Sequence, residues 1–346
     1  MKIFRQPHFI KHYERASVKM KKFVFWGILF FLCLSFGSCK KKPKDKWEDT
    51  LTTGIIKIAC DENFTTLINA EIDAFEAHNN YLAIINPIYT NEKEAIRLLL
   101  DDSVRLALTT RDLNAQEQKE AKDKQMLVRS FLIAFDGIAL ISNKANPDSL
   151  ISLSTIKKIL TGEITDWSQI NSKSPLSTIR VIFDNNRSSI LRYVVDSITK
   201  GDSLSSNLYA LSNSDELIKK VCELPNTIGI IGFNILSDEN RWKSSNFEDK
   251  FRVMRIGKEE PSTIQNTYLP YAGDIKNEDY PLWRPIYVLL SDPNPKFGLS
   301  SGFSIFLAHD VGQTVILKSG LLPAVSDPQN RSVNIIDDYP DENNKK

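Results

Sequence analysis

From Gly54 onward, short runs of apolar residues alternate with longer stretches in which apolar residues recur every three or four positions. Runs of the first kind are typical of buried strands, and stretches of the second kind are typical of amphipathic helices. For example, Ile55–Ala59 predicts a strand, and Thr65–His78 predicts the helix that follows it. Because this strand–helix order recurs along the chain, we expect an α/β fold with layers around largely parallel sheets.

The same two patterns continue to residue 318. Further strands are expected at residues 82–85, 104–108, 131–142, 178–183, 228–231 and 285–290. Further helices are expected at residues 92–100, 114–125, 154–160, 188–197, 213–222 and 303–318. Residues 333–346, which end in the polar stretch Asp337–Lys346, are expected to be a disordered tail. The sequence contains no internal repeat, and its length of 346 residues suits two domains.

The N-terminus has the pattern of a bacterial lipoprotein leader. Lys21 and Lys22 precede an apolar run of 14 residues, Phe23–Phe36, and the small residues before Cys39 look like a lipobox. A membrane-spanning helix needs ~20 apolar residues, so the run is typical of a signal-peptide core. We therefore expect residues 1–38 to be a leader and signal peptide, with Cys39 lipidated. A plain signal peptide with an incidental cysteine is the alternative.

Met20 is the more natural start of this leader, which would make residues 1–19 an upstream extension or the product of a misassigned start. Residues 39–52 are predicted to be a polar, lysine-rich tether. Lys40–Lys42 do not resemble the acidic residues that mark some lipoproteins for export to the cell surface. We therefore expect a periplasm-facing lipid anchor, in either the inner or the outer membrane.

Composition and charge exclude several classes of protein. Charged residues make up 25% of the chain and hydrophobic residues 42%, which are ordinary globular values. Residues 1–38 hold seven basic residues and one acidic residue, so the other 308 hold 37 basic and 42 acidic residues. A mildly acidic body argues against nucleic acid as a partner, because nucleic-acid binding requires neutralisation of phosphates.

Familiar metal and catalytic motifs are missing from the sequence. The histidines of the body, His78 and His309, and its cysteines, Cys60 and Cys222, are isolated and do not have the spacing of a zinc site. No Gly-x-Ser-x-Gly elbow, Walker sequence or His-Glu-x-x-His sequence is present, and Ser188 has no obvious histidine partner. We therefore expect no metal, no cofactor and no enzymatic activity.

Five groups of residues occur in a characteristic order: Asp136–Ala139 with Asn143–Pro147, Ile159–Trp167, Ile228–Gly232, Tyr280–Tyr287, and Gly312–Gln313 with Gly320–Pro323. In this order they resemble the phosphate-binding family of type 2 periplasmic solute-binding proteins. The resemblance implies two α/β lobes with mixed sheets, joined by two crossovers, with a ligand cleft between the lobes. Carried over to this chain, lobe I comprises residues 53–138 and 239–332, and lobe II comprises residues 139–238.

Four loops match the positions that hold an oxyanion in this family. The implied ligand-binding residues are Asn63, Phe64, Thr90, Thr109, Thr110, Arg111, Asp184, Ser188, Ser189 and Arg192. In the family, hydroxyl groups and the free N–H groups of helix N-termini donate to the anion, beside one basic residue. Arg111 is the expected main charge partner, with Arg187 and Arg192 as alternatives. Ser188 and Ser189 are also good N-cap residues, whatever their part in binding.

Two positions depart from the family pattern. Asp184 stands where many members have an arginine, and Ile190 lacks the hydroxyl of the usual threonine. Together with Asp61 and Glu62, Asp184 adds negative charge near the expected cleft, which opposes an anion. One of these carboxylates can instead accept the proton of hydrogen phosphate and so reject fully ionised sulfate.

The resemblance thus implies a monomeric, lipid-anchored periplasmic binding protein that captures phosphate and delivers it to the permease subunits of an ABC importer. Binding is expected to close the lobes by hinge motion at the crossovers. Two alternatives remain open. One is a binding or sensory lipoprotein of the same fold for a different ligand, and the other is an envelope scaffold without a small-molecule ligand.

Overall fold

The computed structural model describes residues 48–237, 249–291 and 298–325, all within one compact unit, Trp47–Lys346. The expected signal peptide, the expected lipidation site Cys39 and the tail at residues 333–346 lie outside the described residues. Within the described ranges, no helix is both long enough and apolar enough to cross a membrane.

The last residues of the predicted tether pack against lobe I. The backbone N–H of Leu299 donates to the Asp49 carboxylate at 2.7 Å. A Cβ atom at Gly302 would lie 1.8 Å from the carbonyl oxygen of Leu51, so the two segments approach too closely for any side chain there. Residues 49–52 therefore belong to the folded body, and the tether is shorter than expected.

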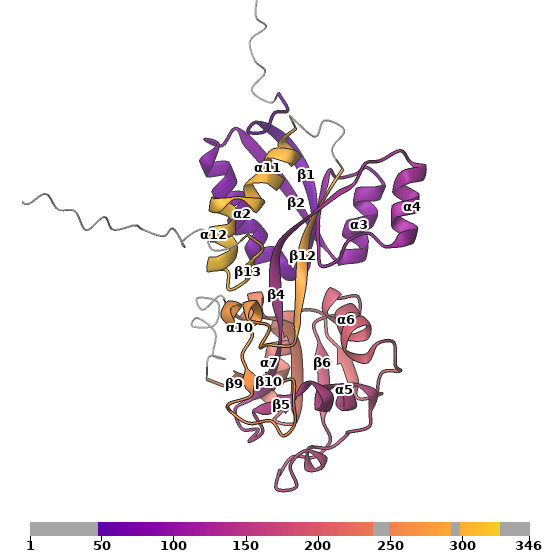
Figure 1. The fold of residues 1–346 in the computed structure, drawn as a ribbon, viewed down its shortest axis with the longest axis vertical. Helices are drawn as coiled ribbons and strands as arrows, with labels where there is room; N and C mark the ends of the chain where they lie inside the picture. The colour runs from indigo at the N-terminus through magenta and orange to yellow at the C-terminus, as the bar shows by residue number, and fades with distance from the viewer. Residues whose placement is uncertain (1–47, 238–248, 292–297, 326–346) are drawn as a thin grey trace, which may run out of the picture. The chain divides into compact units, whose positions relative to one another are not determined.

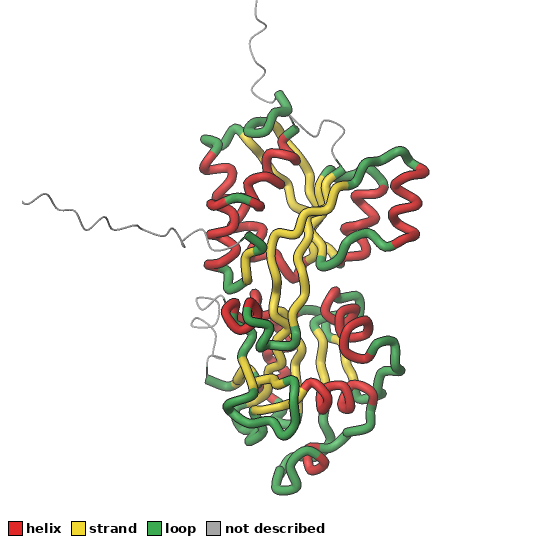
Figure 2. The backbone as a smooth tube through the Cα atoms, in the orientation of Figure 1, coloured by secondary structure: helices red, strands yellow, loops and turns green. Residues whose placement is uncertain are grey.

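Lobe I is a sheet covered by helices on both faces (Figures 1 and 2). Its strand order is β2, β1, β3, β12 and β4, with β1 parallel to β2 and β3 and with β12 antiparallel to β3 and β4. The strands are β1 (Gly54–Asp61), β2 (Ala83–Thr90), β3 (Leu106–Thr109), β4 (Arg129–Asn143), β12 (Trp283–Leu290) and the short β13 (Leu322–Pro323), which pairs with β4. The helices are a 3₁₀ turn (Glu62–Phe64), α2 (Thr65–His78), α3 (Glu92–Leu100), α4 (Ala115–Asp123), α11 (Leu299–Ala308) and α12 (Asp310–Lys318).

Successive side chains of each strand point to opposite faces, so lobe I has two hydrophobic layers. On one face, Ile58 of β1 belongs to a buried cluster with Phe75 of α2 and Phe303 of α11, whose rings lie 5.3 Å apart edge to face. On the other face, Ala59 belongs to a second cluster that includes Ile96 of α3. Helices therefore pack on both faces of the lobe I sheet, through two separate buried clusters.

The helix predicted over residues 303–318 is two helices, α11 and α12. His309 between them has an extended backbone, with φ −113° and ψ 173°. A Cβ atom at Gly312 would lie 2.4 Å from the carbonyl oxygen of Phe306, which shows how tightly α12 turns against α11. The prediction was wrong because both helices pack on the same core, so the apolar pattern continues across the break.

Two strands, β4 and β12, run side by side from one lobe into the other (Figure 1). Along β12, Leu290 pairs with Arg129 and Trp283 pairs with Gly137, so the pairing covers the first half of β4. The second half of β4 pairs with β8 (Thr227–Gly232) of lobe II. The two crossovers implied by the resemblance are therefore β4 and β12.

Lobe II has its own sheet and a small three-stranded one. In the larger sheet β6 lies parallel to β7 and β8, while β8 and β9 lie antiparallel to β4. The strands are β5 (Leu150–Ser152), β6 (Arg180–Phe183), β7 (Leu208–Ala210), β8, β9 (Phe251–Val253), β10 (Arg255–Gly257) and β11 (Thr267–Tyr268). The helices are α5 (Leu153–Thr161), a 3₁₀ turn (Trp167–Gln169), α6 (Ser189–Tyr193), a π-helical turn (Val194–Thr199), α7 (Ser214–Glu223), α8 (Phe233–Leu236) and α10 (Ala272–Lys276).

Lobe II continues beyond the expected range, residues 139–238. Val253 of β9 pairs with Ile141 of β4, and β10 pairs with β5. Ile275 of α10 is buried in the main hydrophobic cluster of lobe II. The described residues 249–284 therefore belong to lobe II, and the chain returns to lobe I along β12. Apolar periodicity marks a strand but does not tell which sheet the strand joins, which is why the expected boundary needs this correction.

One buried carboxyl group in α2 makes a testable prediction. Glu71 has no exposed surface, and neither carboxyl oxygen has a hydrogen-bond partner among the described residues. Burial raises the pKa of Glu71 to about 9, from 4.5. Because the folded state holds the proton more tightly than the unfolded state, the resulting stability is present below pH 4.5 and is lost as the pH rises towards 9.

Glu71→Gln should therefore raise the free energy of unfolding at pH 7 by about 3 kcal/mol, and this gain should vanish at acid pH. Chemical denaturation across pH 4–8 measures both effects. Asp73→Asn, which changes an exposed carboxylate of the same helix, is the control and should not reproduce the pH trend. A gain that is absent or constant with pH would contradict the prediction.

Candidate functional site

The four predicted ligand loops meet at one edge between the lobes. Three of them follow the carboxyl ends of the parallel strands β1, β2 and β3 in lobe I, and the fourth follows β6 in lobe II. The carboxyl ends of parallel strands share one edge of a sheet, where ligands of α/β proteins commonly bind. At this edge Asp61 pairs with Thr90 in the β1–β2 register.

The deepest part of this edge holds a fully buried ion pair on the two crossover strands. Arg284 of β12 lies opposite Asp136 of β4 in the register. Its Nε and Nη2 atoms donate to one Asp136 carboxylate oxygen at 3.1 and 3.0 Å, and neither side chain is exposed. Burial raises the pKa of Asp136, while the charge of Arg284 acts in the opposite direction.

Arg284 also connects the two lobes. Its Nη1 atom donates to Ser189 Oγ at the start of α6, at 2.6 Å. Its guanidinium lies 5.1 Å from the ring centroid of Phe64, a distance at which a cation and an aromatic face attract each other. Asn63 Nδ2 donates to the same Ser189 hydroxyl at 3.3 Å. The predicted residues Asn63, Phe64 and Ser189 are thus gathered around an arginine that sequence reasoning did not select.

The carboxylates at this edge are shielded from water. Burial raises the pKa of Asp61 to about 6, and Arg284 opposes that rise. Burial likewise raises the pKa of Asp184, against the neighbouring Ser188 hydroxyl and the N–H of Asn185. A neutral carboxyl group repels an anion less than a carboxylate does. Burial therefore reduces the electrostatic repulsion between an anion and Asp61 or Asp184.

Two of the predicted hydroxyl groups are engaged in local structure. Ser188 is the N-cap of α6, and its Oγ accepts from the N–H of Ile190 at 3.0 Å. The Thr109 hydroxyl donates to the carbonyl oxygen of Arg111 at 2.8 Å, which shapes the turn after β3. The side chains of Ser188 and Thr109 therefore hold the loops in place in this structure.

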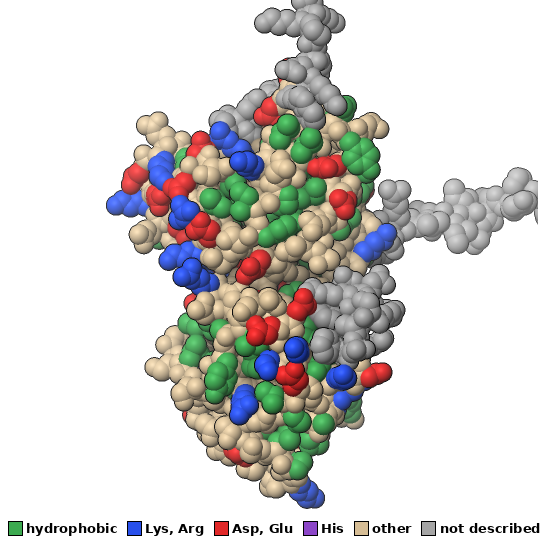
Figure 3. All heavy atoms as spheres, turned by 180° about the vertical axis from the view of Figure 1, so that it is seen from behind, with side chains coloured by type: hydrophobic (Ala, Val, Ile, Leu, Met, Phe, Trp, Pro, Cys, Tyr) green, Lys and Arg blue, Asp and Glu red, His purple; other side chains and the backbone are tan. Residues whose placement is uncertain are grey.

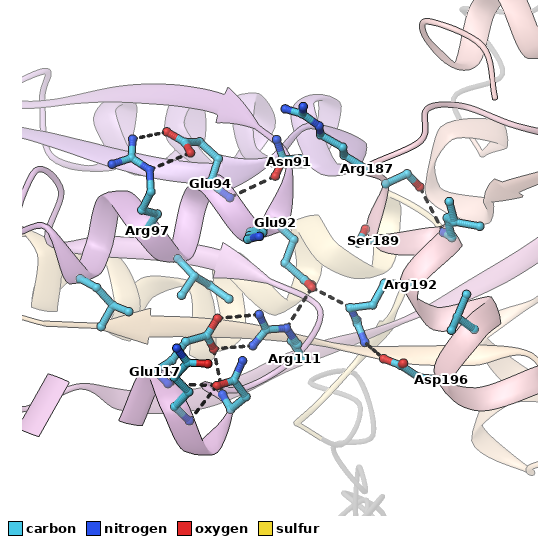
Figure 4. Close-up of a pocket in the computed structure, with 18 of the residues that line it drawn as sticks. Asn91, Glu92, Glu94, Arg97, Arg111, Glu117, Arg187, Ser189, Arg192 and Asp196 are labelled. Atoms are coloured by element: carbon cyan, nitrogen blue, oxygen red, sulfur yellow. Dashed lines mark hydrogen bonds and ion pairs between the residues drawn. The ribbon is translucent and has the colours of Figure 1, made fainter. Parts of the chain in front are cut away.

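Beside this buried cluster lies an open pocket of about 1040 Å³ (Figure 4). It is lined by α3 and α4 of lobe I and by α6 of lobe II. Five side chains along it alternate in charge across the two lobes: Glu117, Arg111, Glu92, Arg192 and Asp196. We call these five residues the ion-pair ladder.

The guanidinium group of Arg111 forms ion pairs with two carboxylates of the ladder. Its Nη1 and Nη2 atoms donate to the two Glu117 carboxylate oxygens at 2.7 and 2.8 Å, and its Nε lies 3.3 Å from Glu92. The hydrogen bonds with Glu117 raise the pKa of Arg111. The expected main charge partner for a ligand is therefore already paired on one side by a residue of its own lobe.

At the centre of the ladder, donors from both lobes surround the carboxylate of Glu92. Glu92 Oε2 accepts from the backbone N–H of Thr110 at 2.8 Å and from the Thr110 hydroxyl. Glu92 Oε1 accepts from Arg192 Nε at 2.8 Å, and Arg192 Nη2 donates to the Thr110 hydroxyl oxygen at 2.8 Å. Donors from the loop after β3 and from α6 thus converge on one carboxylate, and Figure 4 shows Arg111 and Arg192 directed at Glu92. Thr110 and Arg192 were predicted, whereas Glu92 was not.

Two of the residues that sequence reasoning missed, Arg284 and Asp136, could have been found from the sequence. Arg284 is the only charged residue in the apolar strand Trp283–Leu290, and Asp136 is the only one in Phe131–Ser142. A lone charge within a buried strand needs a partner, so these two were candidates for each other. For Glu92 no comparable signal exists, because an acidic residue at the start of a helix is common. The described residues contain no group of three or more side chains that is suited to hold a metal ion.

The sequence matches a family model described as the PBP superfamily domain over residues 48–311. The chain belongs to the PBP superfamily. This result and the two-lobed α/β architecture confirm the expected fold and the expected resemblance. Residues 48–311 also cover every predicted ligand loop, so the site lies inside the family domain.

Two curated relatives show what this PBP domain is similar to. The phosphate-binding protein PstS of Staphylococcus epidermidis is 24% identical over 206 residues, which cover 59% of this chain and 59% of that protein. The phosphate-binding protein PstS of Staphylococcus aureus is 22% identical over 213 residues, 61% of each chain. The alignments thus span about three fifths of these relatives. Both relatives are named as binding proteins rather than enzymes, in agreement with the expectation for this chain.

Solved structures share the fold of this PBP domain. A substrate-binding protein of Clostridium perfringens, solved with bound phosphate, superposes with a TM-score of 0.64 at 21% identity, covering 79% of this chain and all of that one (100%). An ABC-type phosphate transport receptor of Vibrio cholerae gives a TM-score of 0.59 at 18% identity, covering 78% and 100%. At these identities the likeness establishes the fold.

The buried pair makes a prediction about stability. Arg284→Met should lower the free energy of unfolding by about 3–5 kcal/mol, because it leaves Asp136 buried without a charge partner. The double variant with Asp136→Leu should recover most of this loss. Denaturant titration measures both effects, and Arg97→Met, which changes an exposed arginine of α3, should have little effect. An Arg284→Met loss as small as that of the control would contradict the prediction.

Proposed function

We propose that this chain is a lipid-anchored, periplasmic solute-binding protein that captures phosphate in the interlobe cleft and delivers it to an ABC importer. The observation that carries the proposal is the convergence of Thr110, Arg111 and Arg192 on one carboxylate. An N–H group, a hydroxyl and two guanidinium groups are the donors that a tetrahedral oxyanion requires. The relatives named for phosphate binding and phosphate transport support the choice of ligand.

The two crossover strands supply the motion that the proposal needs. Single side chains make direct contacts between the lobes, such as Asn185 Nδ2 to Glu62 Oε1 at 2.6 Å and Ser237 Oγ to the carbonyl oxygen of Ser319 at 2.6 Å. Rotation about β4 and β12 can therefore open the cleft without unpacking a lobe. The permease subunits would recognise the closed form. We propose a monomer for the chain, because the cleft is complete within one copy.

Surface charge fits a protein that does not bind nucleic acid. On the face drawn in Figure 3, Lys and Arg side chains are interspersed with Asp and Glu side chains over both lobes. Binding to a nucleic acid backbone requires a basic patch or stripe instead. Nucleic acid is therefore not among the proposed partners, which are phosphate, the permease and the membrane.

The second candidate function is the binding of a different ligand by a protein of the same fold. Asp61, Glu62 and Asp184 lie at the inner end of the cleft, and burial raises the pKa of each. These groups favour a ligand that carries a proton or another donor. A binding or sensory lipoprotein for such a ligand is the alternative, and a scaffold role would require that no small molecule binds.

Calorimetry on the soluble form that starts after Cys39 tests the phosphate proposal. Heat of binding is expected with phosphate at millimolar concentration, and less with sulfate, arsenate or molybdate. Arg111→Ala should weaken phosphate binding by about a hundredfold, because removing one partner of a buried charge contact costs about 3 kcal/mol. Arg105→Ala, in the exposed pair with Asp102, is the control and should leave binding unchanged. A preference for another anion would replace the proposed ligand, and no heat from any of them would favour a scaffold.

The lipid anchor is tested separately. Cys39→Ala should release the chain from the membrane fraction, because buried acyl chains supply the attachment at about 0.8 kcal/mol for each CH₂ group. Fractionation followed by detection of the chain measures the effect, and Cys33→Ala in the apolar run is the matched control. A Cys39→Ala protein that stays in the membrane pellet would contradict a purely lipid anchor.

A further inference from the structure

Glu92 is far more buried than its place on a helix requires. It occupies the first turn of α3, after the N-cap Asn91, where a carboxylate is favourable and usually faces water. Glu94 of the same turn behaves in this way, with 36% of its side chain exposed and an ion pair with Arg97. Glu92 is only 3% exposed and points into the cleft (Figure 4). Helix capping accounts for an acidic residue at this position but not for its burial.

The contacts of Glu92 are those that a bound oxyanion would receive. One carboxylate oxygen accepts from the N–H and the hydroxyl of Thr110, and the other contacts the guanidinium groups of Arg111 and Arg192. Three of these four donors belong to lobe I and one to lobe II. The carboxylate therefore fills a complete anion subsite and holds the two lobes together at that point.

We infer that Glu92 is an internal occupant of the oxyanion subsite and lowers its affinity, because an incoming oxyanion must displace it. This inference rests on the proposed function. Thr110, Arg111 and Arg192 form the subsite, and the side chain of Glu92 is the group that leaves it.

Electrostatics favours displacement over simultaneous binding. The ion-pair ladder holds two arginines and three carboxylates, so it carries one net negative charge. A phosphate beside this set would face a carboxylate whose charge is not neutralised and that already holds the same donors, so the two like charges would repel each other. With Glu92 moved out, two cations and two anions remain, and an anion can enter.

The pocket provides room for the displaced side chain. Its volume is about 1040 Å³, and Glu92 itself lines it. Lys93 and Arg187 line the same pocket and make no ion pair with another described residue, so unpaired positive charge is available at its rim. A rotated Glu92 would therefore reach water and cations instead of remaining in the subsite.

Competition of this kind lowers the measured affinity in a predictable way. The apparent dissociation constant equals the intrinsic value divided by the fraction of molecules whose subsite is free. If Glu92 fills the subsite in about nine molecules of ten, its removal strengthens binding about tenfold. The same factor applies to every anion that competes with Glu92, so the removal of Glu92 should strengthen the binding of each of them alike.

The experiment compares wild type, Glu92→Gln, Glu92→Ala and Glu94→Gln by calorimetry with inorganic phosphate and with sulfate. Both Glu92 variants should bind phosphate at least about tenfold more tightly than wild type. Glu94→Gln removes the same charge from the same helical turn, outside the subsite, and should match wild type. Circular dichroism and thermal unfolding show whether each variant is folded, and Arg111 and Arg192 keep Glu117 and Asp196 as partners in all of them.

Small-angle scattering without ligand gives a second reading that does not depend on phosphate. Loss of the Glu92 contacts with Arg192 should open the cleft and increase the radius of gyration of both Glu92 variants, and phosphate should compact them again. Glu94→Gln should scatter like wild type.

The outcomes separate the inference from the proposed function. If wild type binds phosphate and the Glu92 variants bind it equally or more weakly, Glu92 is not a competitor, and the proposed function stands. Tighter phosphate binding by the Glu92 variants supports both the inference and the proposed function, even where wild type shows no measurable heat of binding. If no protein in the set binds phosphate, the proposed function fails, and the inference fails with it. Unchanged scattering of the folded Glu92 variants would show that Glu92 does not hold the lobes together.

Discussion

The arrangement of the cleft depends on one ion pair, between Arg284 and Asp136, which joins the two strands that cross between the lobes. Both side chains are fully buried, so neither charge can be satisfied by water. The pairing register sets them directly opposite each other, and this fixes where the guanidinium projects. Ser189 from lobe II and Phe64 from lobe I then meet at that guanidinium. A buried pair is weak evidence for stability, but it strongly restricts geometry, because the loss of either partner leaves a desolvated charge.

Two polar layers of different character therefore separate the lobes. In the inner layer, Arg284 is fully buried and forms an ion pair with Asp136, and both residues lie on the crossover strands β12 and β4. The outer layer is the ion-pair ladder beside the open pocket, where Arg192 of lobe II reaches Glu92 of lobe I. Hinge motion changes distances least near the hinge and most away from it. In the proposed hinge motion the outer layer would therefore move most, and the inner layer would move least.

Many of the residues that were expected to hold a ligand bond to other residues of the protein in this structure. Ser189 accepts from Arg284, Thr110 bonds to Glu92, and Arg111 is paired with Glu117. A ligand of this cleft must therefore exchange internal contacts for its own, and only the difference between the two sets contributes to affinity. In the proposed mechanism, Glu92 is the group whose contacts with Thr110, Arg111 and Arg192 a ligand would have to replace.

The sequence alone determined the alternation of strands and helices and the apolar face of α2. It also predicted the loops at the ends of β1, β2, β3 and β6, whose part in binding a ligand stays a prediction. Periodicity and local motifs carry this information because they depend on near neighbours in the chain. Only the tertiary structure decided that β9 and β10 belong to lobe II, that residues 303–318 form two helices, and that Arg284 faces Asp136 across 148 positions of sequence. It likewise decided that Glu92 turns into the cleft while Glu94 faces water. The reason is that sheet register and side-chain burial are set by partners distant in the chain, and no local pattern specifies those partners.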